Sequence, residues 1–294
     1  VPTPLTYFAS HYLNIGSAVS VTGSHNPPQY NGLKIVIAGG TLAGQEIQDL
    51  RHHILSRRDA SQRGDMRTES VTNAYIDRVL SDIKLARPLR IAVDSGNGVA
   101  GMIAPSLYRQ LGCEVIELYS EVDGQFPNHH PDPSQPENLR DLKEVVTTEK
   151  VDLGIAFDGD GDRLGVLSPD GEIIWPDRQL LLFANDVLSR EPGAEIIYDV
   201  KCSRLLSAAI QNAGGRATMW RTGHSYIKAK LKESGAALAG EMSGHIFFQD
   251  RWYGFDDAIY AGARLCELLA QHSESTTTIF RSLPNTVNTP ELRL

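Results

Sequence analysis

Three aspartates follow an apolar run directly in the segment FDGDGDR. Carboxylates this close repel one another unless a cation neutralises them, and the intervening glycines let Asp158, Asp160 and Asp162 converge. Hard oxygen ligands of this kind suit Mg²⁺ or Ca²⁺ rather than zinc. An EF-hand is excluded, because its sixth and twelfth positions would be Arg163 and Pro169 instead of Gly and Glu. We therefore predict a cation site with a guanidinium beside it that can bind a phosphate oxygen.

A second reactive group is Ser24, in the segment TGSHNPPQYNG between two strand-like runs. His25 and Asn26 bring hydrogen-bonding groups next to its hydroxyl, and two prolines restrict the backbone that follows. The G-x-S-x-G elbow of α/β-hydrolases is absent, because Asn26 stands where the second glycine belongs. A plain turn serine and a phosphate carrier remain as interpretations. A phosphorylated Ser24 would supply the anionic ligand that the acidic segment calls for.

These loops need rigid elements to position them, and strand-like and helix-like segments alternate along the chain. We expect strands at 17–21, 33–38, 90–94, 113–119, 152–157, 195–200, 216–220 and 237–242. We expect helices at 102–112, 136–150, 177–190 and 223–234. Ser134 and Glu137 have the spacing of a capping box at the start of the second of these helices. The alternation predicts several consecutive α/β domains with mixed sheets.

Composition limits the class of protein. A chain of 294 residues suits two or three domains, and a net charge of −8 argues against a nucleic-acid partner. No apolar run approaches the roughly 20 residues of a membrane span, and no signal peptide is recognisable. The three cysteines are scattered and form no CxxC pair, which favours a reducing compartment. We expect a cytoplasmic monomer without a membrane partner.

Four segments occur in a set order along the chain: TGSHNPPQYNGLKI, FDGDGDR, RTGHS and GEMSGH. Together with DSGNGVAG and FPNHHPDPSQPENL, they resemble the α-D-phosphohexomutase family, most closely its bacterial phosphomannomutase/phosphoglucomutase branch. The resemblance implies an intramolecular phosphotransferase that interconverts hexose 1-phosphates and hexose 6-phosphates, of glucose or mannose. The implied route uses a phosphoserine and a 1,6-bisphosphate intermediate, in a central cleft between the domains. Hexose phosphates are the implied partners, and Mg²⁺ and hexose 1,6-bisphosphate, as activator, are the implied cofactors.

The resemblance also assigns residues. It implies a Mg²⁺ site made of the serine and the three aspartates, namely Ser24, Asp158, Asp160 and Asp162. It implies catalytic roles for Ser24, His25, Lys34, Arg163 and His224. The sequence does not choose the general acid and base among His25, Lys34 and His224. It implies substrate-binding roles for Lys201, Thr222, Gly223, Glu241, Ser243 and His245. His129 and His130 look like a metal pair, but neighbours in a strand point to opposite faces, so we expect a structural loop.

The family has four domains, and we expect the chain to cover three of them. The expected boundaries are 1–68 for a partial first domain with the serine loop and 69–171 for a domain with the metal loop. A domain with the sugar-binding loop is expected at 172–284, and 285–294 would begin the family's fourth domain. We therefore expect a piece of a longer protein that binds Mg²⁺ but has weakened affinity for sugar phosphates.

Three alternatives stay open. Phosphoglucosamine mutase is the nearest one, although Met242 favours the glucose and mannose branch. A haloacid-dehalogenase-type enzyme would use Asp158 as nucleophile, but its motif usually continues with Thr or Val where Asp162 stands. A non-catalytic sugar-phosphate-binding protein is the third.

Overall fold

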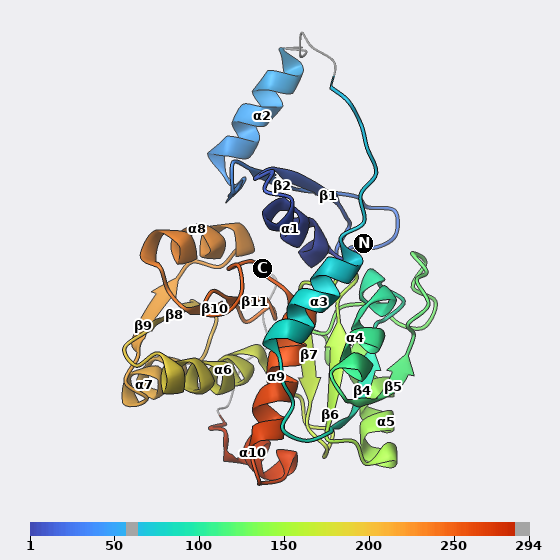
Figure 1. The fold of residues 1–294 in the computed structure, drawn as a ribbon, viewed down its shortest axis with the longest axis vertical. Coiled ribbons are helices and arrows are strands. Elements are labelled where there is room, and N and C mark those ends of the chain that lie inside the picture. The colour runs from blue at the N-terminus through green and yellow to red at the C-terminus, as the bar shows by residue number, and fades with distance from the viewer. Residues whose placement is uncertain (57–63, 286–294) are drawn as a thin grey trace.

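The computed structural model describes residues 1–56 and 64–285. Its strands form three separate sheets that follow one another along the chain, and helices pack against them (Figure 1). The expected boundary segment at 56–67 falls partly outside the described residues, and the expected start of a fourth domain falls almost wholly outside them.

The first unit is a small antiparallel sheet with one helix packed on it. The serine segment is the loop between its first two strands, which pair from Ala18↔Val36 to Val21↔Leu33. The third strand extends the same antiparallel sheet. Its elements are α1 (Thr3–Tyr12), β1 (Ala18–Val21), β2 (Leu33–Ile37), β3 (Gly40–Thr41) and α2 (Gln45–Leu55).

The second unit contains a mixed sheet with the strand order β5-β4-β6-β7. Strands β4, β5 and β6 are parallel, and β7 returns antiparallel to β6. The acidic segment is the loop that makes this return. The elements are α3 (Thr72–Asp82), β4 (Arg90–Asp94), η1 (Val99–Met102), α4 (Ala104–Gln110), β5 (Glu114–Leu118), η2 (Pro136–Leu139), α5 (Arg140–Glu149), β6 (Leu153–Phe157) and β7 (Leu164–Leu167).

The third unit repeats that arrangement with the strand order β11-β10-β8-β9. Strands β8, β9 and β10 are parallel, and β11 is antiparallel to β10. The GEMSGH segment is the loop between β10 and β11, so it has the same place here as the acidic loop has in the second sheet. The elements are α6 (Pro176–Arg190), β8 (Glu195–Asp199), α7 (Leu205–Asn212), β9 (Arg216–Trp220), α8 (His224–Ser234), β10 (Leu238–Gly240), β11 (Ile246–Phe248), α9 (Ala258–Gln271) and α10 (Thr276–Ser282).

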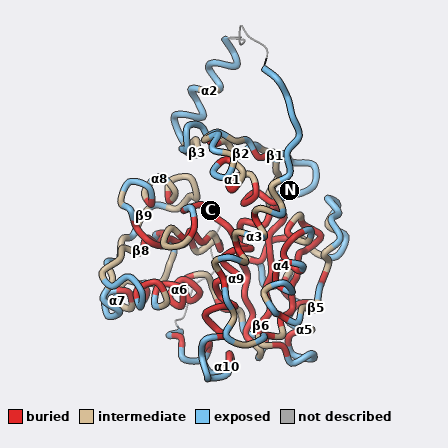
Figure 2. The backbone as a smooth tube through the Cα atoms, viewed as in Figure 1, coloured by how far each residue is buried: buried red, intermediate tan, exposed pale blue. Residues whose placement is uncertain are grey.

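Helix α9 joins the second and third units. It packs on β6 and β7 of one sheet and on β11 of the other. Every residue from Ala258 to Ala270 is buried, which the red tube of α9 makes visible (Figure 2). A helix that is buried on all sides belongs to a core, so these two sheets share one apolar interior. By contrast, α2 has no buried residue and stands away from the body (Figures 1 and 2).

The prediction of consecutive α/β units with mixed sheets is confirmed for the second and third sheets, whereas the first sheet is antiparallel throughout. The expected capping box is wrong. Ser134 Oγ donates to Asp132 Oδ1 at 2.7 Å, and the helical segment opens with a 3₁₀ turn whose N-cap, Gln135, makes no side-chain cap bond. Among the described helices, none has the length and apolar character that crossing a membrane requires.

Candidate active site

The serine turn has a strained backbone. Ser24 has a φ of +52°, a conformation that non-glycine residues rarely adopt. Two bonds within the turn support it: the Ser24 N–H donates to Thr22 Oγ1 at 2.8 Å, and the Asn26 N–H donates to the Gly23 carbonyl at 2.9 Å. Strain of this kind persists only where the surroundings hold it, and here it sets the direction of the serine hydroxyl.

The Ser24 hydroxyl points at the acidic loop. Its Oγ donates to Asp158 Oδ2 at 3.1 Å and lies 3.1 Å from His25 Nδ1. The two backbones also touch, since a Cβ on Gly159 would lie 2.2 Å from the Ser24 carbonyl oxygen. Burial, together with the Arg163 charge, lowers the pKa of His25, so its imidazole is neutral near pH 7. A neutral imidazole at this distance can exchange a proton with the serine oxygen.

Asp158 fixes the shape of the acidic loop. Its Oδ1 accepts from the backbone N–H groups of Gly161, Asp162 and Arg163 at 3.1, 3.0 and 3.1 Å. Its Oδ2 accepts from Arg163 Nε at 3.0 Å, in addition to the serine hydroxyl. The carboxylate is fully buried, and these donors replace the water it loses.

Asp160 and Asp162 face the Lys34 ammonium. Lys34 Nζ lies 2.7 Å from Asp160 Oδ2 and also bonds Asp162 Oδ2. Burial, followed by the Asp160 charge, raises the pKa of Asp162 to about 7. Burial alone would lower the pKa of Lys34, but the two carboxylates raise it above its usual value. The ammonium thus offsets part of a repulsion that a bound cation would remove.

The donor set fits a hard divalent cation. One oxygen from each of Asp158, Asp160 and Asp162 lies within 4.8 Å of the others, and all three residues are buried. Asp160 Oδ1 and Asp162 Oδ1 have no hydrogen-bond partner among the described residues. Buried carboxylate oxygens without a donor are costly unless a ligand completes them. A metal ion at this loop accounts for both.

Arg163 lies between two carboxylates behind the loop. Its Nε bonds Asp158, and its Nη1 lies 3.1 Å from Asp132 Oδ1. Its Nη2 is buried and has no hydrogen-bond partner among the described residues. A guanidinium held at two nitrogens and free at the third is fixed in place with a donor left for an anion.

A buried carboxylate, Asp256, lies among three basic side chains of the third unit. It lies 2.8 Å from Lys228 Nζ, 3.1 Å from His245 Nδ1 and 3.5 Å from His224 Nδ1. The two imidazoles stack with centroids 5.5 Å apart. Burial is the largest influence on His224 and lowers its pKa to about 3. Burial also acts on His245, but the charges of Asp162 and Asp256 outweigh it and raise the pKa of this imidazole. The pair therefore combines a neutral and a readily protonated imidazole.

The RTGHS and GEMSGH loops are bonded to each other and to the acidic loop. Glu241 accepts from the Gly223 N–H, and Thr222 Oγ1 donates to Asp199 Oδ2 at 2.8 Å. The Gly244 carbonyl accepts from the N–H of Leu164, directly after Arg163, at 3.0 Å. His245 Nδ1 also lies 3.6 Å from Asp162 Oδ1. The loops of the second and third sheets are thus in direct contact.

Most of the predicted site residues are joined by these contacts. Lys201 is exposed after β8, and Ser243 is half-buried in the turn before β11. The structure adds residues that the sequence reasoning missed: Asp256, Lys228 and Asp132, together with Thr3, whose hydroxyl donates to Asp160 Oδ2 at 2.6 Å. The adjacent aspartates Asp256 and Asp257 could have indicated this part of the site from the sequence. Asp257 is the N-cap of α9 and accepts from the Tyr260 N–H, so its neighbour is available for the site.

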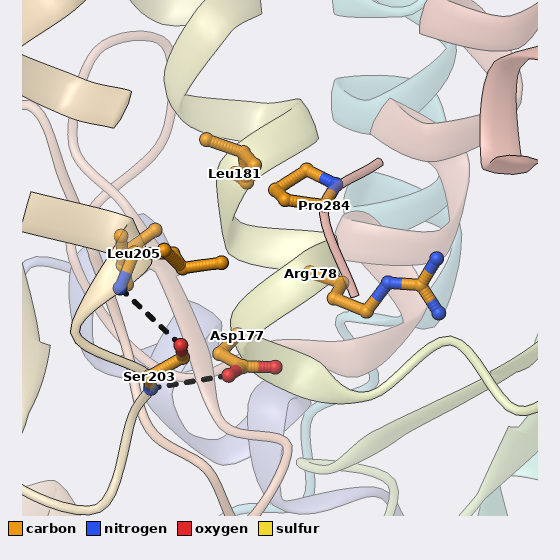
Figure 3. Close-up of a pocket in the computed structure, with 7 residues that line it drawn as sticks. Asp177, Arg178, Leu181, Ser203, Leu205 and Pro284 are labelled. Atoms are coloured by element: carbon orange, nitrogen blue, oxygen red, sulfur yellow. Dashed lines mark hydrogen bonds between the residues drawn. The ribbon is translucent and has the colours of Figure 1, made fainter. Parts of the chain in front are cut away.

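Two described cavities lie apart from the serine and the acidic loop, and the larger one borders Lys228 of the Asp256 cluster. One of about 20 Å³ is lined by Asp177, Ser203 and Pro284 at the start of α6, and there the Ser203 N–H bonds Asp177 Oδ2 (Figure 3). That volume holds about one water. Another, of about 620 Å³, lies between α1 and α8 and includes His11 and Lys232. Neither contains the serine or the acidic loop.

Comparison with known proteins agrees with the geometry. Three phosphoglucomutase/phosphomannomutase models match, all described as alpha/beta/alpha domains: domain I at 1–60, domain II at 73–171 and domain III at 175–287. The phosphomannomutase/phosphoglucomutase of Pseudomonas aeruginosa is 56% identical over the whole chain, which covers 64% of that protein. A phosphoglucomutase of Neisseria gonorrhoeae is 52% identical, with the same 64% covered.

A solved structure of a phosphoglucomutase/phosphomannomutase family protein from Burkholderia thailandensis is also similar. Its TM-score is 0.95 at 52% identity, over 99% of this chain and 65% of that one. The chain thus spans slightly less than two thirds of the length of the relatives it matches. The three domain models together cover nearly all of this chain. The chain therefore belongs to the phosphoglucomutase/phosphomannomutase family, in the bacterial branch of the α-D-phosphohexomutases.

Proposed function

We propose that the protein is a phosphohexomutase that interconverts the 1-phosphates and 6-phosphates of glucose or mannose. The observation that carries this proposal is the position of Ser24 Oγ, 3.1 Å from Asp158 and beside the buried Arg163. A serine that carries a phosphoryl group needs a cation and a fixed arginine next to it; the acidic loop could hold the first, and Arg163 is the second. The names of the bacterial relatives support the same reaction.

The cation in this proposal is Mg²⁺. The available donors are carboxylate oxygens, which favour magnesium or calcium over zinc or copper. Asp158, Asp160 and Asp162 would hold it, with the phosphorylated Ser24 completing the set. When bound, the ion neutralises charge on the transferring phosphoryl group.

Each residue then has a part in a balanced transfer. The phosphorus–oxygen bond to Ser24 breaks as a bond from a sugar hydroxyl to phosphorus forms. The serine oxygen gains a proton and the sugar hydroxyl loses one. His25, with its Nδ1 at 3.1 Å, is placed to relay the proton to Ser24: its neutral ring gives a proton from Nδ1 as it accepts one from solvent at Nε2. Arg163 stabilises the phosphoryl oxygens, and Lys34 adds positive charge at the acidic loop.

Residues of the third unit are proposed to bind the sugar hydroxyls and the second phosphate. Glu241 and Ser243 can hold neighbouring hydroxyls, and Thr222 and Gly223 line the same loops. Lys201 is proposed to bind the phosphate that does not react. The stacked pair of His224 and His245 on Asp256 is proposed to accept the proton of the attacking hydroxyl.

Further parts of the proposal follow the family. Hexose 1,6-bisphosphate is the intermediate and also the activator that phosphorylates Ser24. We propose a cytoplasmic monomer with hexose phosphates, and neither nucleic acid nor membrane, as partners. The boundaries 1–68, 69–171, 172–284 and 285–294 remain proposed divisions.

Phosphopeptide mapping and activity of a Ser24→Ala variant test the proposal. The wild-type protein, incubated with glucose 1,6-bisphosphate and Mg²⁺, is expected to carry phosphate on Ser24. The variant should lose activity on glucose 1-phosphate and mannose 1-phosphate by a factor of roughly 10⁴ or more. Phosphate on Asp158 would instead indicate an aspartyl-phosphate enzyme. Preference for glucosamine 6-phosphate would indicate a phosphoglucosamine mutase. If neither protein turns over substrate and Ser24→Ala leaves sugar-phosphate binding unchanged, the protein is a non-catalytic binding protein.

A further inference from the structure

The loop of residues 127–133 contacts the serine turn from a different sheet unit. His130 Nε2 bonds the carbonyl oxygen of His25, the residue next to the reactive serine. A carbonyl can only accept, so the imidazole nitrogen is the donor. We propose that His130 is a positioning residue, whose N–H bond holds the serine turn so that Ser24 Oγ faces Asp158. This inference rests on the proposed function, because it assigns part of the geometry of that reaction.

The serine turn needs support from outside itself. The bonds of Ser24 to Thr22 and of Asn26 to Gly23 stay within the turn, so they would move with it as a unit. They do not fix the turn relative to the acidic loop. The His130 bond does, because it comes from the unit that contains the acidic loop. A positive φ at a serine is the kind of conformation that such an external contact maintains.

The loop that carries His130 has a rigid base. His129 Nε2 bonds the buried Asp94 Oδ2 at 2.9 Å, at the end of β4, and His129 Nδ1 bonds the His130 carbonyl at 3.0 Å. The packing is tight, since a Cβ on Gly96 would lie 3.0 Å from Pro131 Cβ and 3.2 Å from His129 Cε1. One histidine of the pair thus anchors the loop, and the other reaches across to the serine turn.

The same loop also holds the phosphate-binding arginine. Asp132 Oδ1 lies 3.1 Å from Arg163 Nη1 and accepts from both the N–H and the hydroxyl of Ser134. His130 and Asp132 are two residues apart in this loop. His130 contacts the backbone beside Ser24, and Asp132 contacts the guanidinium of Arg163. A single short loop thereby sets the distance between the group that carries the phosphoryl and the group that stabilises its charge. Small errors in such a distance reduce the rate of transfer more than binding.

The test compares His130→Ala and His130→Gln in the full-length protein. Glutamine offers an amide N–H in place of the ring N–H, and so it keeps a donor to the His25 carbonyl. His53→Ala, on the exposed helix α2, is the matched control. Three quantities are measured: kcat and KM on glucose 1-phosphate, the melting temperature, and hydrogen exchange of the backbone amides of residues 23–26.

We expect His130→Ala to lower kcat roughly tenfold or more while KM stays within about threefold of wild type. Exchange at residues 24–26 should speed up about tenfold in this variant. His130→Gln should recover most of both effects, and His53→Ala should show neither. Such a pattern separates positioning from general stability, because a purely structural loss would follow the melting temperature and not the presence of a donor.

Three results would overturn the proposal: an Ala variant with wild-type kcat and exchange, equal losses in the Ala and Gln variants, or a loss confined to melting temperature. Should the wild-type protein neither isomerise hexose phosphates nor carry phosphate on Ser24, the proposed function fails. The exchange measurement would still decide whether His130 holds the turn, since it needs no activity.

Discussion

Single carboxylates organise this site by accepting from several groups at once. Asp158 accepts from three backbone N–H groups, a guanidinium and a hydroxyl. Asp256 faces two imidazoles and an ammonium. Because these carboxylates are fully buried, removing one negative charge leaves cations without a partner in a medium that solvates them poorly. The contribution of such a residue is mainly orientation of its neighbours.

Replacing Asp256 with asparagine tests this at the residue scale. The amide keeps the size of the side chain but cannot balance the charge of Lys228, and it removes one of the carboxylates, with Asp162, that raise the pKa of His245. We expect kcat to fall roughly 10- to 100-fold, with a smaller change in KM. Steady-state kinetics on glucose 1-phosphate measures both, and Asp49→Asn on the exposed helix α2 is the control. A wild-type kcat in the Asp256 variant would remove this residue from the proton path.

At the scale of elements, the three reactive loops share one design. Each joins two antiparallel neighbours: β1 and β2 for the serine, β6 and β7 for the acidic residues, and β10 and β11 for the GEMSGH loop. In the two mixed sheets, the loop leaves the carboxyl end of a parallel strand, where ligand sites of α/β proteins form. Close contact between the loops then depends on glycines.

Gly159 is the sharpest example of that dependence. A methyl group there would lie 2.2 Å from the Ser24 carbonyl oxygen, so Gly159→Ala must push the serine turn away from the acidic loop. We expect kcat to fall roughly 100-fold or more, with the melting temperature changed by only a few degrees. Gly124→Ala is the matched control, because nothing lies within 4 Å of its added Cβ. Equal activity in the two variants would contradict the close approach of the loops.

At the scale of the whole molecule, buried ion pairs connect elements far apart in the chain. Arg264 on α9 is fully buried and pairs with Asp250 after β11, at 2.9 Å, and with Asp186 on α6, at 3.0 Å. Arg251 pairs with Glu267 on α9 and, at 3.2 Å, with Asp82 on α3. These contacts hold α9 against its neighbours and so fix the second sheet relative to the third.

The Asp250–Arg264 pair makes stability depend on pH. Burial would raise the pKa of Asp250, but its bonds with Arg264 outweigh burial and lower it. A carboxylate with a depressed folded pKa stabilises the protein above its unfolded pKa of about 3.9, and that stability is lost as pH falls through the folded pKa. Asp250→Asn should cost about 3 kcal/mol at pH 7.

Urea unfolding of wild type and Asp250→Asn at several pH values measures that difference. It should be full at pH 5 to 7 and should shrink as the pH drops below about 4. Asp123→Asn, in an exposed loop, serves as the control. A difference that stays constant down to acid pH would show that the charge of Asp250 is not its cause.

Metal binding should also stabilise the fold as a whole. The acidic loop connects β6 and β7 and contacts the serine turn, and a Mg²⁺ ion bound there would hold its carboxylates together. At a hundredfold excess over Kd, such binding adds about 2.7 kcal/mol to the free energy of unfolding. We expect Mg²⁺ to raise the melting temperature of wild type but not of Asp162→Asn, as measured by calorimetry. An equal rise in both proteins would place the ion elsewhere.

Much of the fold and part of the site could be predicted from the sequence. The strands before the reactive segments, and β2 after the serine turn, fall within two residues of their expected positions, because alternation of apolar residues and turn residues is a local signal. Strands β7 and β11, which follow the acidic and GEMSGH segments, were not predicted. The family is confirmed by its domain models. The roles of the site residues and the domain boundaries stay predictions. The predicted capping role of Ser134 was wrong, because its hydroxyl bonds Asp132 instead.

The sequence by itself determined which chemical groups are present, in what order, and on which loops: a serine turn, an acidic loop and the GEMSGH loop, each next to a strand. Only the tertiary structure decided which groups meet. Lys34 lies between Asp160 and Asp162, His245 lies on Asp256, and His130 reaches the serine turn. Contacts between sheets depend on strand pairing and on how the units pack through α9. No local spacing encodes that geometry, so these partners could not be found in advance.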